Sequence, residues 1–192
     1  MDIAGVLLVG GESRRFGRQK AFAHWKDKEF YQWSFEALNE ETQNTVIISH
    51  PSIEENLKMM YDQVYLDDLK YRGKGPLAGL YTGMKKIKAN WYAILPCDTP
   101  NITRDVLAEL KELRDERFDA IVPVIEGKKQ PLIALYHKRT LPFIIENLEE
   151  GNLRMSSLLD SISVLFANNL KSPSSAFLNI NDQDTYQKCR SF

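Results

Sequence analysis

The chain has 192 residues, of which 43% are apolar and 27% are charged, and its formal net charge is −1. This length suits one folded domain, and the near-neutral charge argues against broad binding to nucleic acid or to a membrane surface. Two cysteines far apart, Cys97 and Cys189, indicate neither a disulfide framework nor a zinc site. The first apolar stretch is too short for a signal peptide, and no segment reaches the length of a membrane span, so we expect a cytoplasmic protein.

Short runs of β-forming residues alternate with segments of helical periodicity in the early part of the chain. The runs predicted as strands are residues 3–9, 45–49, 64–66, 91–95 and 120–124. The segments predicted as helices are residues 31–39, 53–61, 77–88 and 103–115, the last with Thr103 as a candidate N-cap. Because strands separated by helices join through right-handed crossovers, this order predicts an α/β fold: a Rossmann-like, mostly parallel sheet with helices on both faces.

The alternation loosens after residue 124. Residues 126–129 (EGKK) predict a turn, and residues 132–136 (LIALY) predict a strand that returns from it as an antiparallel partner. Helices over 141–149 and 156–160, a strand near 164–166 and a terminal helix from Asp182 complete the expected elements. The sequence therefore predicts a single domain, residues 1–192, with a small antiparallel extension after residue 124.

The strongest functional signal is the segment that follows the first predicted strand. Residues 10–20 read GGESRRFGRQK, and their glycines allow backbone N–H groups to approach an anion closely. Arg14, Arg15 and Lys20 would neutralise the negative charge of that anion. The spacing matches neither the GxxxxGK[ST] phosphate loop nor the GxGxxG dinucleotide fingerprint. A basic surface loop is the plain alternative, but it leaves the paired Gly10 and Gly11 directly after a strand unexplained.

A second cluster, residues 96–100 (PCDTP), ends the strand predicted over 91–95. Its two prolines make a rigid turn that fixes where Asp98 projects. A carboxylate opposite a phosphate loop repels the ligand unless a cation lies between them, and Mg²⁺ binds through one or two carboxylates plus substrate phosphates. Asp98 could instead cap the next helix, but Thr103 is the better cap. We interpret Cys97 as a small buried residue and not as a catalytic thiol.

A third cluster joins Asp67 and Asp68 to residues 73–79 (GKGPLAG). The glycines allow backbone to lie against a flat base or ribose, and an aspartate can accept hydrogen bonds from hydroxyl or base N–H groups. Asp68 is equally well explained as a solvated loop charge. All three clusters follow predicted strands, and in an open parallel sheet ligands bind at the carboxyl ends of the strands. The three histidines lie far apart without the spacing of a zinc site.

Together these motifs resemble those of the molybdenum cofactor guanylyltransferases, within the wider nucleotidyltransferase class. The family pattern LAGGxSxRxGxxK resembles residues 8–20 of this chain, and further matches are residues 75–79 (GPLAG), 96–100 (PCDTP), 130–132 (QPL), 134–136 (ALY) and 179–181 (NIN). Val9 departs from the usual alanine, and residues 182–184 (DQD) depart from a common Thr-Pro-Glu. Gly10-Gly11 and the GPLAG form favour GTP over CTP within this class. The resemblance implies a nucleotide-diphospho-sugar transferase-like fold.

The resemblance also implies an activity: transfer of GMP from GTP to the terminal phosphate of Mo-molybdopterin, forming molybdopterin guanine dinucleotide and releasing pyrophosphate. It implies nucleotide binding by Leu8, Val9, Gly10, Gly11, Arg14, Lys20, Asp67, Gly75, Pro76, Leu77 and Asp98. It implies catalytic roles for Lys20, Arg15 and Asp98, with Asp98 holding Mg²⁺, and an acceptor side formed by Arg154, Asn179 and Asn181. Residues 1–124 would then bind the nucleotide and residues 125–192 the acceptor, and other molybdenum-cofactor biosynthesis proteins would be partners.

Alternative functions remain open at this point. A nucleotidyltransferase with another nucleotide or acceptor, such as a molybdopterin cytidylyltransferase or a sugar-1-phosphate nucleotidyltransferase, would use the same phosphate and metal groups. A non-catalytic nucleotide-binding regulator would bind nucleotide without turnover, although Lys20 and Asp98 together argue against it. A hydrolase of the phosphate-loop class is disfavoured because the GK[ST] sequence is absent.

Overall fold

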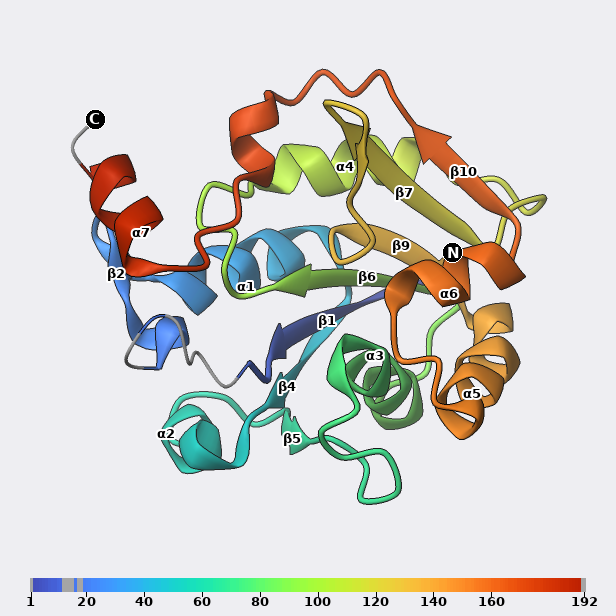
Figure 1. The fold of residues 1–192 in the computed structure, drawn as a ribbon, viewed down its shortest axis with the longest axis horizontal. Helices are drawn as coiled ribbons and strands as arrows, with labels where there is room; N and C mark the ends of the chain where they lie inside the picture. The colour runs from blue at the N-terminus through green and yellow to red at the C-terminus, as the bar shows by residue number, and fades with distance from the viewer. Residues whose placement is uncertain (1, 12–15, 17–18, 191–192) are drawn as a thin grey trace.

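The computed structural model describes residues 2–11, 16 and 19–190, shown as a ribbon in Figure 1. Arg14 and Arg15, which the sequence predicts to bind phosphate, lie outside the described residues. Within the described part of the chain, no helix combines the length and the apolar character needed to cross a lipid bilayer.

The described residues form one eight-stranded sheet and a separate two-stranded sheet. The large sheet has the order β10-β7-β9-β6-β1-β4-β5, with β8 paired to β7. Its strands are β1 (Ile3–Val9), β4 (Asn44–Ser49), β5 (Val64–Leu66), β6 (Trp91–Pro96), β7 (Ala120–Ile125), β8 (Lys128–Lys129), β9 (Ala134–His137) and β10 (Val164–Ala167). The small sheet pairs β2 (His24–Trp25) with β3 (Lys28–Glu29).

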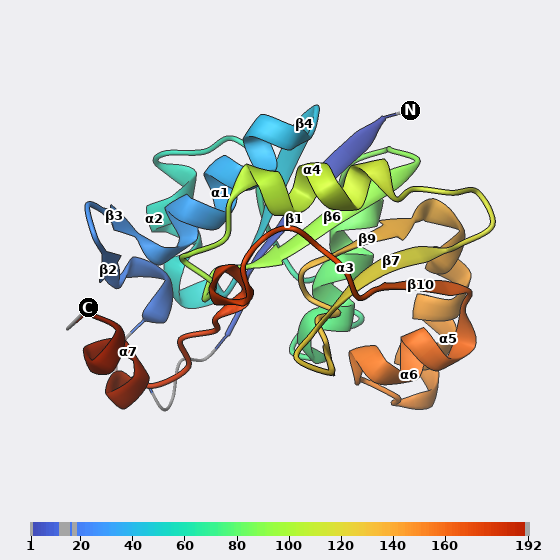
Figure 2. The same ribbon diagram turned by 90° about the horizontal axis from the view of Figure 1, so that it is seen from above.

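Helices cover both faces of the large sheet, as predicted (Figure 1). The helices are α1 (Phe30–Glu41), α2 (Glu54–Lys58), α3 (Gly75–Lys86), α4 (Arg104–Glu112), α5 (Leu141–Glu150), α6 (Met155–Ser161) and α7 (Gln183–Arg190). Alternate residues of β1 serve the two faces: Leu7 joins the apolar cluster under α1 and α4, whereas Val6 joins the cluster under α3, α5 and α6. Figure 2 shows the same layers from above.

The predicted antiparallel strand is present, and it lies inside the sheet. β9 sits between β6 and β7 and is antiparallel to both of them. The α/β prediction is therefore confirmed. The antiparallel strand expected after residue 124 lies beside β6, at the edge of the parallel strands β6, β1, β4 and β5.

One helix is shorter in the structure than its periodicity predicts, and the predicted start of another is confirmed. The helix expected over 53–61 is a 3₁₀ turn, Pro51–Ile53, followed by the short α2. Met59 and Met60, which would continue that helix, are exposed, so no apolar burial supports a longer helix. Thr103 is the N-cap residue of α4 as expected, although its side chain makes no capping hydrogen bond.

Candidate active site

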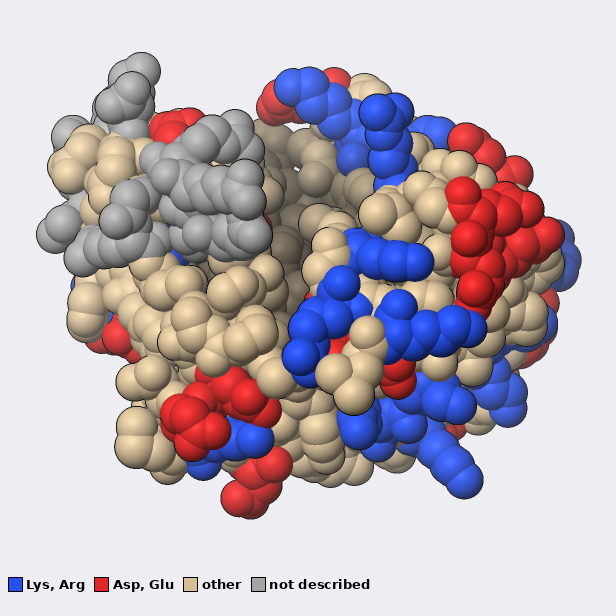
Figure 3. Space-filling view, turned by 60° about the horizontal axis from the view of Figure 1, so that its bottom comes forward, with Lys and Arg blue, Asp and Glu red and all other residues tan. Residues whose placement is uncertain are grey.

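A cavity of about 530 Å³ opens at the carboxyl ends of β1, β4, β5 and β6. β1 lies between β4 and β6 in the sheet. After β1 the chain forms β4 and β5 on one side of β1 and then crosses to form β6 on the other side. Ligands of open α/β sheets bind at such a switch point, outside the carboxyl ends of the strands. The molecular surface is hollowed on the face shown in Figure 3, where Lys and Arg side chains gather beside the hollow.

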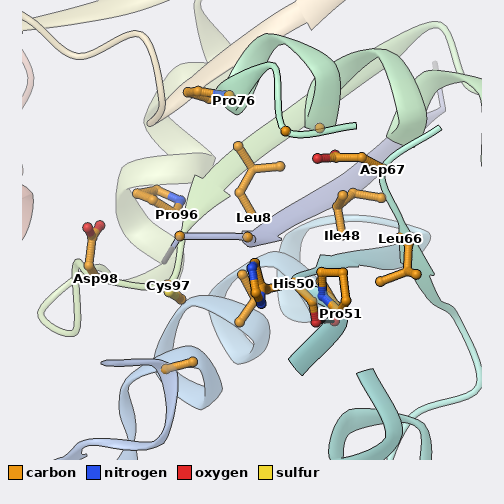
Figure 4. Close-up of a pocket in the computed structure, with 18 of the residues that line it drawn as sticks. Leu8, Ile48, His50, Pro51, Leu66, Asp67, Pro76, Pro96, Cys97 and Asp98 are labelled. Atoms are coloured by element: carbon orange, nitrogen blue, oxygen red, sulfur yellow. Dashed lines mark hydrogen bonds between the residues drawn. The ribbon is translucent and has the colours of Figure 1, made fainter. Parts of the chain in front are cut away.

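Nine of the predicted nucleotide-binding residues line this cavity: Leu8, Val9, Gly10, Gly11, Lys20, Asp67, Gly75, Pro76 and Asp98. Figure 4 shows several of them around the space between the ends of the strands. At Gly10 and Gly11 a Cβ atom would meet nothing within 4 Å. The backbone of this turn therefore faces open space, as an anion-binding turn requires.

Lys20 and Asp98 meet at one side of the cavity although 78 residues separate them in the sequence. The Lys20 Nζ lies 2.6 Å from Asp98 Oδ2, and the two side chains are only 12% and 14% exposed. Lys20 Nζ also donates to Asn181 Oδ1 at 3.1 Å, and the Ile180 backbone N–H donates to the Asp98 carbonyl at 2.9 Å. The C-terminal segment thus helps to hold this pair at the cavity.

The second carboxylate oxygen of Asp98, Oδ1, is buried and has no hydrogen-bond partner among the described residues. A buried carboxylate oxygen without a partner is costly unless a cation or donor completes it. Within the described residues no group of three or more His, Cys, Asp or Glu side chains could hold a metal ion. Among the described residues, the Asp98 carboxylate is therefore the donor that this side of the cavity offers, and it fits Mg²⁺ when substrate phosphates and water supply the remaining ligands.

Asp67 lines the cavity from the end of β5, opposite the Asp98 side. Burial raises the pKa of the Asp67 carboxyl, while the Gly73 backbone amide and the charges of Arg72 and His50 act in the opposite direction. Asp68 stabilises the following loop instead, because its carboxylate accepts a hydrogen bond from the Lys70 backbone N–H at 3.0 Å. The two neighbouring aspartates therefore have different tasks.

The GPLAG segment contributes to the cavity and to packing. Gly75 and Pro76 line the cavity at the start of α3, and Gly75 has a φ of +74°. Gly79 packs against β1, where a Cβ atom would lie 2.6 Å from Leu8 Cδ2. The Leu77 side chain is fully buried in the apolar core, and Leu77 is not among the residues that line the cavity.

The cavity residues that were not predicted as site residues include three from the segments after β4 and β5: His50, Pro51 and Arg72. His50 directly follows β4, so the rule that ligands bind at strand ends could have found it. Its Nδ1 accepts a hydrogen bond from the Ser52 backbone N–H at 3.2 Å. Arg72 had no comparable signal, because the path of the loop that carries it is not encoded in a periodic pattern.

The predicted acceptor residues do not come together at the cavity. Asn181 reaches Lys20, as described above, whereas Asn179 and Arg154 are exposed and do not line the cavity. Arg154 is the N-cap residue of α6 and the last residue of the connection from α5.

Cys97 lines the cavity next to Asp98 and is buried. Burial, followed by the negative charge of Asp98, raises the pKa of the Cys97 thiol to about 12. The group therefore stays a neutral thiol at ordinary pH and is unsuited to nucleophilic attack. This agrees with its interpretation as a small buried residue.

The chain is similar to known proteins over nearly its whole length. Residues 5–164 match the model of the MobA-like NTP transferase domain. A protein named "Probable molybdenum cofactor guanylyltransferase" from Bacillus subtilis (strain 168) is 45% identical over 189 residues, 97% of this chain and 94% of that protein. A protein of the same name from Bacillus cereus (strain B4264) is 38% identical over 95% of this chain and 93% of its own length.

A solved structure supports the fold. The crystal structure of molybdopterin-guanine dinucleotide biosynthesis protein A from Archaeoglobus fulgidus matches with a TM-score of 0.82 over 100% of both chains, at 22% sequence identity. The resemblance seen in the motifs is thus confirmed over the length of the chain, and the cavity at the strand ends is where such a fold places its ligand. The chain belongs to the MobA-like NTP transferase domain family of nucleotidyltransferases.

Proposed function

We propose that this chain transfers GMP from GTP to the terminal phosphate of Mo-molybdopterin, which forms molybdopterin guanine dinucleotide and releases pyrophosphate. The names of the 45% and 38% identical relatives support this choice of nucleotide and acceptor. The observation that carries the proposal is the meeting of Lys20 and Asp98 at a cavity built from strand ends. A cation and a carboxylate with one unpartnered oxygen are the two groups that phosphoryl chemistry needs there.

The proposed reaction is a single in-line displacement. An oxygen of the acceptor's terminal phosphate forms a bond to the α-phosphorus of GTP, the bond from that phosphorus to the β-phosphate oxygen breaks, and pyrophosphate leaves with its electron pair. The backbone of Gly10 and Gly11 and the ammonium of Lys20 would hold the triphosphate. Lys20 would leave Asp98 for the phosphates, and its positive charge would offset the charge that develops on pyrophosphate.

Asp98 would hold Mg²⁺ through its unpartnered Oδ1. When bound, Mg²⁺ supplies positive charge that polarises the phosphoryl oxygens and stabilises the leaving group. Asp67 would contact the nucleoside, and the backbone from Leu8 to Gly10 would line the guanine and ribose. Catalysis would thus rest on positioning and charge stabilisation, with no covalent intermediate on the protein.

Several parts of this proposal rest on the sequence alone. The first 124 residues would supply most of the nucleotide site and residues 125–192 the acceptor site, with Arg154, Asn179 and Asn181 on the acceptor side. Arg14 and Arg15 would complete the phosphate site. Contacts with other molybdenum-cofactor biosynthesis proteins, a cytoplasmic location and the lack of nucleic-acid or membrane partners stay predictions.

The direct test is to incubate the protein with each α-labelled nucleoside triphosphate and each candidate acceptor, and to measure pyrophosphate and the labelled product. We expect product from GTP with molybdopterin that carries molybdenum. Product from CTP, or with a sugar 1-phosphate, would assign one of the alternative transferases. Phosphate release from GTP alone would indicate a hydrolase, and binding without turnover would indicate a regulator.

Substitution of the pair tests the roles of the two residues. Lys20→Ala and Asp98→Asn should each lower turnover by about 100-fold or more, because each removes charge that stabilises the transition state. Asp98→Asn should also raise the Mg²⁺ concentration needed for half-maximal rate, whereas Lys20→Ala should not. Lys85→Ala and Asp105→Asn, at exposed positions on α3 and α4, are the matched controls. A near-normal rate in either site variant removes that residue from the mechanism.

A further inference from the structure

The segment between β5 and α3 brings several groups to the cavity wall. Asp67 lies at its start, Arg72 and Gly73 in its middle, and Gly75 at its end, and all of them line the cavity. Few backbone hydrogen bonds hold the middle of this segment: the Tyr71 N–H donates to the Asp68 carbonyl at 2.9 Å, and the Lys74 N–H to the Tyr71 carbonyl at 3.0 Å. Residues 67–75 are named the Asp67 loop below.

The middle of the Asp67 loop is fixed from outside by the Tyr71 side chain. This side chain is only 2% exposed, and its ring packs against Tyr81 of α3 with centroids 4.9 Å apart. Its hydroxyl donates a hydrogen bond to the carboxylate of Glu149, in the last turn of α5. The same carboxylate oxygen of Glu149 also forms an ion pair with the ammonium of Lys70.

A second contact ties the loop to the same end of α5. The Lys74 Nζ donates to the backbone carbonyl of Leu148 at 3.2 Å, where a helix C-terminus carries partial negative charge. Both ends of the turn around Tyr71 are thus joined to α5, which comes from the part of the chain beyond residue 124.

The residues that follow the anchor are the ones that act on Asp67. Arg72 and Gly73 come directly after Tyr71, and the Arg72 charge and the Gly73 backbone amide both act on the Asp67 carboxylate. Because the backbone is continuous, the position of Tyr71 sets the position of both groups. Neither Tyr71 nor Glu149 lines the cavity, so both act only through the loop.

We propose that Tyr71 and Glu149 are positioning residues that hold the Asp67 loop against the nucleoside and thereby set the affinity for the nucleotide. This inference rests on the proposed function in so far as the cavity binds a nucleoside triphosphate. Lys20 and Asp98 lie at the ends of other elements, so loss of the Tyr71–Glu149 contact leaves the chemistry of transfer intact.

The test compares variants that remove one end of the contact. Tyr71→Phe keeps the packed ring and removes only the hydroxyl, and Glu149→Ala removes the acceptor. Each should raise the KM for GTP about fivefold or more and leave kcat within about twofold, the mark of lost ground-state binding. The KM for the acceptor should stay within about twofold in both variants. Glu149→Gln, which retains an oxygen that can accept from Tyr71, should recover most of the affinity.

The double variant and a control sharpen the result. If the two residues act as one contact, Tyr71→Phe with Glu149→Ala should be no worse than the poorer single variant. Glu146→Ala removes an exposed acid from the same helix and should leave the KM for GTP unchanged. Equal KM values for GTP in the wild type, Tyr71→Phe and Glu149→Ala would overturn the proposal, as would a loss confined to kcat.

Calorimetric titration of GTP and Mg²⁺, without acceptor, separates this proposal from the proposed function. Tight binding by the wild type and weaker binding by Tyr71→Phe and Glu149→Ala support the positioning role even if the acceptor assignment fails. Equal binding by all three proteins contradicts the positioning role alone. A wild type that binds no nucleoside triphosphate contradicts both proposals.

Discussion

Asp67 is a binding group whose charge lowers the folding stability of the ligand-free protein. Its carboxyl is buried at the cavity wall, and burial raises its pKa because the charged form loses hydration. An acid whose folded pKa lies above its unfolded value reduces stability when ionised. That loss is present at neutral pH, shrinks as the pH falls below the folded pKa and the carboxyl takes up a proton, and is gone below the unfolded pKa.

Asp67→Asn should therefore stabilise the protein and damage the site. We expect a higher melting temperature than the wild type at neutral pH, with the difference shrinking in acid, because the variant removes the buried charge. The KM for GTP should rise about tenfold or more if the carboxylate accepts hydrogen bonds from the nucleoside. Thermal denaturation across pH, together with steady-state kinetics, measures both effects. An Asn variant that is less stable than the wild type at neutral pH would show that the loop needs the charge.

Cys97 lines the cavity, but we expect no role for its side chain in catalysis. Its raised pKa of about 12 keeps the thiol protonated. Cys97→Ala should retain kcat within about twofold, because a neutral thiol supplies no nucleophile. Rate measurement and a search for protein-bound label after incubation with α-labelled GTP check this. Loss of activity together with loss of a protein-bound label would assign a covalent role to Cys97.

At the scale of elements, α3 approaches β1 closely through two glycines one turn apart. A Cβ at Gly79 would lie 2.6 Å from Leu8 Cδ2, the far end of a flexible side chain at the cavity. A Cβ at Gly83 would lie 2.7 Å from both Cγ atoms of Val6, a fully buried and β-branched residue. The same added methyl group therefore meets a movable neighbour at one position and a stiff one at the other.

Gly79→Ala and Gly83→Ala should thus affect different properties, nucleotide binding in the first and folding stability in the second. Gly83→Ala should lower the free energy of unfolding by about 1–3 kcal/mol, because overpacking pushes α3 away from β1. Gly79→Ala should be less destabilising but should raise the KM for GTP, because Leu8 must turn into the cavity. Denaturant unfolding and kinetics of the two variants measure this contrast. Equal losses of stability, with an unchanged KM in both, would contradict the packing argument.

Sequence reasoning located most elements because their signals are local. β1 and β5 have the predicted bounds, and the other main strands and helices lie within a few residues of theirs. The failures have a common cause in tertiary structure. The place of β9 between β6 and β7 depends on non-local pairing, and α2 is short because Met59 and Met60 find no apolar cover.

The candidate site divides in the same way. Lys20 and Asp98 were predictable because each follows a strand end or its loop, and strand ends share one edge of a sheet. The burial of the Leu77 side chain was not predictable, because the GPLAG motif does not tell which of its side chains faces the core. Arg72 was missed because its position depends on the contact between Tyr71 and Glu149, which lie 78 residues apart in the sequence.

At the scale of the whole molecule, the site is completed by segments from both ends of the chain. Ile180 and Asn181 bond to Asp98 and Lys20, and the Tyr186 hydroxyl donates to the His24 carbonyl at 2.7 Å. Phe16, Trp25, Phe30, Ile180 and Tyr186 form a small apolar cluster beneath this contact. The C-terminal segment thus supports the same side of the cavity as the segment that contains Lys20.

The central claim is that one cavity brings a cation from one end of the chain and a metal-binding acid from the middle to the same triphosphate. A crystal structure of the protein with GTP and Mg²⁺ tests this most directly. It should show the phosphates against the Gly10–Gly11 backbone and Lys20 Nζ, with the metal ion on Asp98 Oδ1. A triphosphate bound outside the cavity, or a metal ion held away from Asp98, would contradict the account.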